Sequence, residues 1–289
     1  MKAVAFAPGH VSGVFAVHDE ATDPLAQGSR GAGWSVMAGA RATVEPAAAT
    51  HIRIAGAESP APVTRAALAH LSDTPVAVRL ELGLPVGQGF GMSAAGTLAA
   101  CLAATHLLGL EPELALEATH RAEIGAGTGL GDAIGSWNGS GEIRMRPGVP
   151  PHGWAMRVDP PEDLRFLYCV LGEGISTPRV IGDSSWKKRT RALGDAAVDR
   201  MIGGGRASAW DAILTESERF SRELGLMPPA MAALGSRLPK GCRWGQTMLG
   251  TTMWITGDDS ALKEARDMLG RAGPILELGI DQNGARMAR

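Results

Sequence analysis

The sequence predicts an α+β protein, because segments patterned like strands and like helices are mixed along the chain without strict alternation. Val76, Val78 and Leu80 alternate with their neighbours and so share one face of a half-buried strand. The alanine-rich run from 93 to 108 has no acidic, Lys or Arg residue and predicts a buried helix. The length of 289 residues fits one large domain or two average ones, and the Pro- and Gly-rich stretch 147–153 is the expected boundary.

The first half of the chain is expected to begin with strands. A short strand over 2–7 ends at Pro8-Gly9, and a polar loop follows as far as Gly33. Further strands, predicted from apolar or alternating residues, cover 34–44, 51–54, 75–82 and 142–145. Helices are expected over 63–71, from 93 onward, and from 111 to 124, where Pro112 suits the first turn.

The second half mixes the two element types in the same way. Strands are expected over 164–171, 248–256 and 274–280. Helices are expected over 185–202, 207–224, 228–236 and 260–270.

The overall charge argues against a nucleic-acid or membrane partner. The chain has 28 basic and 30 acidic residues, a net charge of -2, which leaves no broad basic surface. The densest basic run, 187–191, is interpreted as a solvated helix face. The uncharged stretch between Leu82 and Leu110 is broken by Pro85 and glycines, and its remainder is too short and too weakly apolar to span a bilayer.

The cysteines indicate a reducing compartment. Cys101, Cys169 and Cys242 are odd in number, far apart and without metal-ligand spacing, so neither disulfides nor a zinc site are expected. The N-terminal residues lack the apolar core of a signal peptide. Both observations predict a cytoplasmic protein.

The glycine-rich run 85–93 is the strongest candidate for a ligand site. Alternate glycines at 87, 89 and 91 let the backbone approach a ligand, and the helix that follows adds free N–H groups and the positive end of its dipole. A phosphate-bearing cofactor would fit, although the Lys of a P-loop is missing; a tight turn without ligand is the alternative. The expected cofactor contacts are Pro85, Gly87, Gln88, Gly89, Phe90, Gly91, Met92, Ser93 and Ala94.

Four further features could carry chemistry. His120 and Glu123 share one helix face, where Glu123 could ligate magnesium and His120 could bind a substrate oxygen; a solvated polar face is the alternative. Asp132 follows alternate glycines and could be a helix cap, a general base or both. Arg144 could clamp a carboxylate, or charge an exposed strand edge. The segment 245–252 is either a second phosphate cradle or a plain strand entrance.

Several of these blocks together resemble a known family. Ala7-Pro8-Gly9-His10, the loop 85–95 and the segment 246–252 are similar to the three motifs of the GHMP kinase superfamily. Phe90 and Met92 depart from its general pattern, Pro-x-Gly-x-Gly-Leu-Gly-Ser-Ser-Ala. These departures resemble the archaeal pantoate kinases, as do the blocks 28–33, 120–123, 129–132 and 143–148.

The resemblance implies a two-domain fold with the active site in the cleft between the domains. Residues 1–150 would form an N-terminal α+β domain and residues 151–289 a ferredoxin-like C-terminal domain. The implied reaction transfers the γ-phosphate of ATP to the terminal hydroxyl of pantoate, giving 4-phosphopantoate for coenzyme A synthesis. The alternatives are a kinase of another small hydroxy acid or alcohol, such as mevalonate or homoserine, and a nucleotide sensor without turnover.

The resemblance also implies roles for single residues. Ser93 and Glu123 would hold Mg²⁺, and Asp132 would be the catalytic base. Ser29, His120 and Arg144 would contact pantoate. Some members of the superfamily place a lysine beside the base, and none is assigned in this sequence. A homodimer is the expected assembly.

Overall fold

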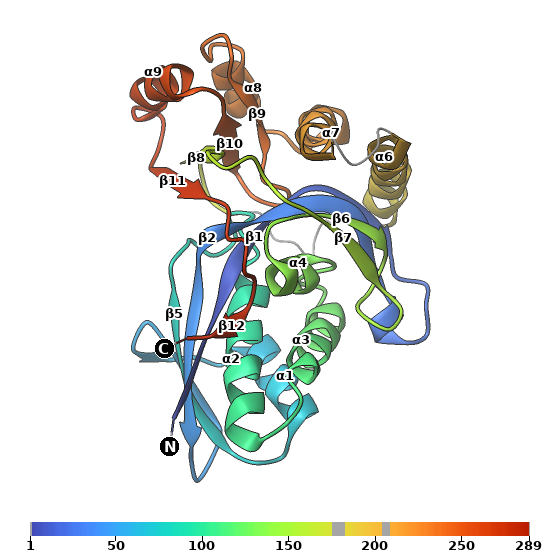
Figure 1. Ribbon diagram of the computed structural model, residues 1–289, viewed down its shortest axis with the longest axis vertical. Helices are drawn as coiled ribbons and strands as arrows, with labels where there is room; N and C mark the ends of the chain where they lie inside the picture. The colour runs from blue at the N-terminus through green and yellow to red at the C-terminus, as the bar shows by residue number, and fades with distance from the viewer. Residues whose placement is uncertain (1, 175–182, 204–208, 289) are drawn as a thin grey trace.

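The chain folds into two β-sheets with helices packed against both (Figure 1). The structure is a computed structural model, and it describes residues 2–174, 183–203 and 209–288. Helices and strands are mixed without alternation, which confirms the predicted α+β class.

The larger sheet has eight strands in the order β12-β1-β2-β5-β3-β4, with β6 paired to β2 and β7 paired to β6. Only β3 and β5 run parallel among these pairs. The strands are β1 (Ala3–His18), β2 (Gly28–Pro46), β3 (His51–Ile54), β4 (Ala57–Glu58), β5 (Val76–Leu82), β6 (Gly141–Arg146), β7 (Trp154–Val158) and β12 (Arg286–Met287).

The first two strands are much longer than predicted. The expected end of the first strand at Pro8-Gly9 is wrong, because a register shift between Pro8 and Gly9 absorbs the irregularity and β1 continues to His18. The expected polar loop up to Gly33 is wrong in its last part, since residues 28–33 pair with β1. The glycines there allow close strand approach: a side chain at Gly31 would lie 2.1 Å from the carbonyl oxygen of Val14.

Figure 1 shows a group of helices beside the larger sheet, and α2 makes the most extensive contact with β1 and β2. These helices are α1 (Pro62–Leu71), α2 (Met92–Leu108), α3 (Glu113–Ala126) and α4 (Asp132–Asn138). Helix α2 is buried from Ala94 to Thr105, as its alanine-rich sequence predicted. Within the described residues, no helix combines the length and apolar character needed to cross a membrane.

The second sheet confirms the ferredoxin-like expectation. Its four strands are antiparallel in the order β11-β8-β10-β9, and one helical connection precedes the β9-β10 hairpin while another follows it. The elements are β8 (Arg165–Val170), α6 (Ser184–Gly203), α7 (Ala209–Leu224), α8 (Pro229–Gly235), β9 (Arg243–Gln246), β10 (Thr252–Thr256), α9 (Asp259–Leu269) and β11 (Ile275–Gly279). The predicted strand 248–256 is too long, because its first residues form a turn.

Aromatic side chains join the two sheets. The ring of Trp34 on β2 stacks on Phe166 of β8 at 5.0 Å and meets the edge of Trp254 of β10. Its indole N–H donates to the Tyr168 hydroxyl over 2.8 Å. Two strands from beyond residue 150 belong to the larger sheet: β12 pairs with β1, and β7 pairs with β6. The division into 1–150 and 151–289 stays a prediction.

Candidate active site

The glycine-rich loop connects β5 to the N-terminus of α2. Gly87, Gly89 and Gly91 have φ angles of 76°, 80° and 59°, a left-handed conformation that favours glycine. No side chain caps α2, so the N–H groups of its first turn remain available to a ligand. Together with the positive end of the helix dipole, these N–H groups are donors of the kind that bind an anion, and the phosphate site at this loop stays a prediction.

Gln88 holds this loop against the second sheet. Its side-chain amide donates to the Gly172 carbonyl over 2.7 Å, and its oxygen accepts from the Thr251 hydroxyl over 2.8 Å. The Thr247 hydroxyl donates to the backbone carbonyl of Gln88. The segment 246–252 therefore packs against the loop, and the side chain of Gln88 is used in hydrogen bonds to this part of the structure.

The other residues of the loop differ in exposure. Pro85 is exposed, Ala94 is buried in the first turn of α2, and Met92 is buried. The ring of Phe90 packs edge-on against Tyr168 with centroids 5.2 Å apart. Phe90 and Met92 therefore contribute their backbone to the site and their side chains mainly to the packing around it.

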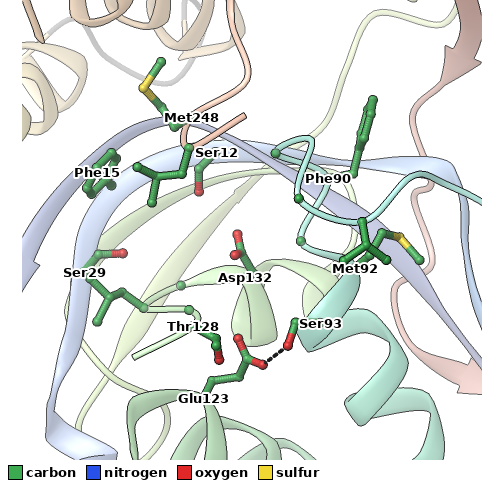
Figure 2. Close-up of a pocket in the computed structure, with 18 residues that line it drawn as sticks. Ser12, Phe15, Ser29, Phe90, Met92, Ser93, Glu123, Thr128, Asp132 and Met248 are labelled. Carbon is green, nitrogen blue, oxygen red and sulfur yellow. Dashed lines mark hydrogen bonds between the residues drawn. The ribbon is translucent and has the colours of Figure 1, made fainter. Parts of the chain in front are cut away.

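A cavity of about 180 Å³ lies in front of the loop. Its lining brings together Ser29, Ser93, Glu123 and Asp132, which come from β2, α2, α3 and α4 (Figure 2). These residues are far apart in sequence, and the fold brings all four into one cavity lining. Phe15, Leu130 and Met248 add an apolar part to the lining.

Glu123 is a buried carboxylate with one unused oxygen. Its Oε1 accepts from the Ser93 hydroxyl over 2.6 Å, whereas Oε2 is buried without a partner, as is the nearby hydroxyl of Thr128. Burial raises the pKa of Glu123 to about 7, and the charge of Asp132 adds to the rise. An unpaired, buried carboxylate oxygen is a group that a cation would stabilise.

Asp132 points into the cavity from the first turn of α4 (Figure 2). Its side chain is 25% exposed, and Oδ1 lies 2.8 Å from Nδ1 of His10. With Oδ1 engaged, Oδ2 is the carboxylate oxygen available to a molecule in the cavity. The helix-cap interpretation is wrong, because Gly131 occupies the cap position and α4 has no side-chain cap.

His10 and Glu142 are polar residues that the sequence did not single out as site residues. His10 appeared only within the Ala7-Pro8-Gly9-His10 block, and its side chain is 0% exposed. Its second ring nitrogen, Nε2, lies 2.8 Å from Oε1 of Glu142, which is also fully buried. The two histidine contacts join residues 122 and 132 positions apart, so local patterns gave no signal for them.

The three residues predicted to contact the substrate hydroxyls or carboxylate lie in different surroundings. Ser29 lines the cavity. His120 is buried outside the lining, with Nε2 2.9 Å from the Gln27 carbonyl, and burial lowers its pKa. Arg144 is 1% exposed, so the exposed-edge alternative is wrong, and its guanidinium contacts Glu142 and the Val14 carbonyl. Neither of the latter two is among the described lining residues.

Comparisons with known proteins agree with the sequence motifs. The family model described as "GHMP kinases N terminal domain" matches residues 61–140. A pantoate kinase from Methanospirillum hungatei is 28% identical and aligns over 98% of this chain and 95% of its own length. One from Thermococcus kodakarensis is 27% identical, over 92% and 91%.

A solved structure supports the same assignment of the fold. It is described as a phosphotransferase related to the CoA biosynthesis pathway. It superimposes with a TM-score of 0.88 and 25% identity, over 100% of this chain and 99% of its own. The two-sheet architecture is therefore that of the GHMP kinases.

Proposed function

We propose that this chain is a kinase of the GHMP superfamily that transfers the γ-phosphate of ATP to the terminal hydroxyl of pantoate and so forms 4-phosphopantoate. The near full-length similarity to pantoate kinases supports the choice of acceptor. The observation that carries the chemistry is the cavity in which Asp132 faces Ser93 and Glu123 in front of an uncapped helix N-terminus.

The phosphates of ATP would lie on the glycine-rich loop. Backbone N–H groups in the loop and in the first turn of α2 are fixed donors, so they stabilise negative charge without reorganisation. Gln88 keeps the loop in this conformation through its contacts with Gly172 and Thr251. Phosphoryl transfer depends chiefly on such positioning and charge neutralisation.

Ser93 and Glu123 would hold Mg²⁺ together with phosphate oxygens. No group of three or more His, Cys, Asp or Glu side chains in the described part of the chain is arranged to hold a metal ion. Magnesium is commonly bound by one or two carboxylates plus substrate phosphates and waters, and the Glu123 carboxylate beside the Ser93 hydroxyl supplies one such ligand. When bound, the ion would neutralise charge on the transferred phosphoryl group.

Asp132 would act as the general base. The terminal hydroxyl oxygen attacks the γ-phosphorus, its proton passes to the Asp132 carboxylate, and the bond between the γ-phosphorus and ADP breaks. The position of Asp132 in the cavity, beside Gly91 at the end of the glycine-rich loop, supports this role.

The rest of the cavity suits a branched hydroxy acid. Phe15, Leu130 and Met248 form an apolar surface on which the two methyl groups of pantoate would pack, and Ser29 would bind a hydroxyl. Arg144 stays a predicted partner of the pantoate carboxylate, because its Nε is buried without a hydrogen bond. Gly131 lies close to this nitrogen: a side chain there would lie 2.6 Å from it. His120 stays a predicted substrate contact; its ring lies against the carbonyl of Gln27, two residues before Ser29.

One assay tests the assignment. ATP-dependent phosphorylation is measured with pantoate, pantothenate, mevalonate and homoserine, and the product is identified by mass spectrometry. We expect turnover of pantoate with kcat/KM at least about tenfold above the other acceptors, since unmatched groups in a fitted pocket cost about 1–3 kcal/mol. Preference for mevalonate or homoserine would assign another acceptor, and nucleotide binding without any turnover would favour a sensor.

The homodimer and the cytoplasmic location remain predictions from the sequence. Sedimentation of the purified protein measures the first, and fractionation of the source cells measures the second.

A further inference from the structure

His10 lies where three parts of the site meet. It directly follows the irregularity at Pro8 and Gly9 in β1. Its backbone N–H donates to the Phe90 carbonyl over 2.9 Å, which attaches β1 to the phosphate loop. Its side chain contacts Asp132 of α4 and Glu142 of β6. One residue thus connects the loop, the base and the neighbouring strand.

Both ring nitrogens of His10 face carboxylates. Nδ1 lies 2.8 Å from Oδ1 of Asp132, and Nε2 lies 2.8 Å from Oε1 of Glu142. An ionised carboxylate only accepts hydrogen bonds, so both nitrogens must donate, and an imidazole with two N–H groups is a cation. Burial alone disfavours that charge, but Glu142 and Asp132 outweigh it and raise the pKa of His10 to about 9.

The imidazole has no room to turn. A side chain at Gly135 would lie 2.3 Å from Cδ2 of the ring, and one at Gly33 would lie 2.7 Å from Nε2. Two glycines therefore let the backbones of β2 and α4 come close to the ring. Because the ring is confined, its N–H groups keep fixed directions.

Charged groups of both signs surround the His10 ring. The acidic groups that face this cluster are Asp132, Glu142 and, across the cavity, Glu123. Arg144 pairs with the same Oε1 of Glu142 that His10 contacts. Glu142 therefore contacts two cations, Arg144 and His10. The other carboxylate that contacts His10 is Asp132, the proposed base.

We propose that His10 is a positioning residue for the base: as an imidazolium held by Glu142, it binds Oδ1 of Asp132 and directs Oδ2 to the acceptor hydroxyl. This inference rests on the proposed kinase function for its catalytic consequence. It also places a confined cation beside the base, at a site where some members of the superfamily have a lysine and where none is assigned in this sequence. Arg144 and Glu142 hold the histidine in turn.

The charge of His10 is tested on the wild-type protein, without nucleotide or acceptor. The protein is labelled with ¹⁵N-histidine, and the His10 signal among the 7 histidines is assigned by its loss in His10→Gln. At pH 7.5 we expect both ring nitrogens to carry protons. A neutral ring with a single protonated nitrogen would overturn the inference, whether or not the enzyme phosphorylates pantoate.

Kinetics test the positioning role. His10→Gln should lower kcat by about 10²-fold, with the KM for ATP changed less than threefold, because Asp132 loses its orienting partner and the phosphate loop keeps its own contacts. His10→Lys should recover at least tenfold of the loss, since an ammonium can donate to Asp132. The matched control is His18→Gln on the same strand, where turnover should stay within twofold.

A structural role alone predicts a different pattern. If His10→Gln only misfolds part of the protein, the number of nucleotide-binding sites should fall in proportion to activity. His10→Lys should then restore neither. The positioning role is rejected if folded, nucleotide-binding His10→Gln keeps kcat within threefold of the wild type. If wild-type enzyme phosphorylates no acceptor, the proposed function fails, and the NMR measurement still decides the state of His10.

Discussion

Asp132 carries the chemical step in this account. An asparagine keeps the shape of the side chain, and its amide oxygen can still accept the hydrogen bond from His10. An amide does not, however, take up the proton of an attacking hydroxyl. Asp132→Asn should therefore lose about 10²–10⁴-fold in kcat while its affinity for ATP stays unchanged. Steady-state rates and nucleotide titration measure the two effects. Asp163→Asn, at an exposed position, is the control, and full activity in Asp132→Asn would remove the assigned base.

The protonation of His10 also links stability to pH. Its pKa is raised from 6.5 to about 9 in the folded protein. Below pH 6.5 both folded and unfolded states hold the proton; between the two values only the folded state does, so stability falls as pH rises through this window. Over this window the loss of stability is on the order of 3 kcal/mol. Urea unfolding from pH 6 to 9.5 should show the decline in wild type and a flatter curve in His10→Gln.

Single residues show where sequence reasoning succeeds and where it stops. Ser93, Glu123 and Asp132 belong to local blocks of recognisable composition, and they do line one cavity. His10 and Glu142 were missed because their roles depend on contacts between distant segments. Burial of Arg144 was missed for the same reason: its neighbours Val14 and Ser12 come from another strand.

In the proposed function, nucleotide binding depends on the glycine-rich loop 85–93. Gly89 has a φ of 80°, and a side chain there would lie 2.5 Å from the Thr247 hydroxyl. Gly89→Ala should raise the KM for ATP about tenfold or more, because the left-handed conformation alone costs about 1–2 kcal/mol. Gly125→Ala is the control, since a side chain at this position in α3 meets nothing within 4 Å. An unchanged KM in Gly89→Ala would contradict the assigned role of the loop.

Elements with a regular pattern were easier to predict than elements with irregularities. Alternation identified β5, and the uncharged alanine-rich run identified α2. The lengths of β1 and β2 were underestimated, because Pro8-Gly9 and the glycines of 28–33 have the composition of turns. Pairing across many residues, including a register shift, keeps both segments in the sheet.

At the scale of the whole molecule, the aromatic contact between the sheets should make them unfold together. Tyr168→Phe removes the hydroxyl that accepts from the Trp34 indole over 2.8 Å. A buried donor without a partner costs about 1–3 kcal/mol, so the free energy of unfolding should fall by that amount in one cooperative transition. Calorimetry measures it, with Trp154→Phe at a 47% exposed site as the control. Two separate transitions would mean that the sheets are independent.

The most direct test of the account is a crystal structure of the protein with Mg²⁺, a non-hydrolysable ATP analogue and pantoate. We expect the γ-phosphate at the N-terminus of α2, the ion between it and the Ser93–Glu123 pair, and the terminal hydroxyl of pantoate within hydrogen-bond distance of Asp132. A triphosphate bound away from residues 87–93, or a hydroxyl that faces away from Asp132, would contradict it.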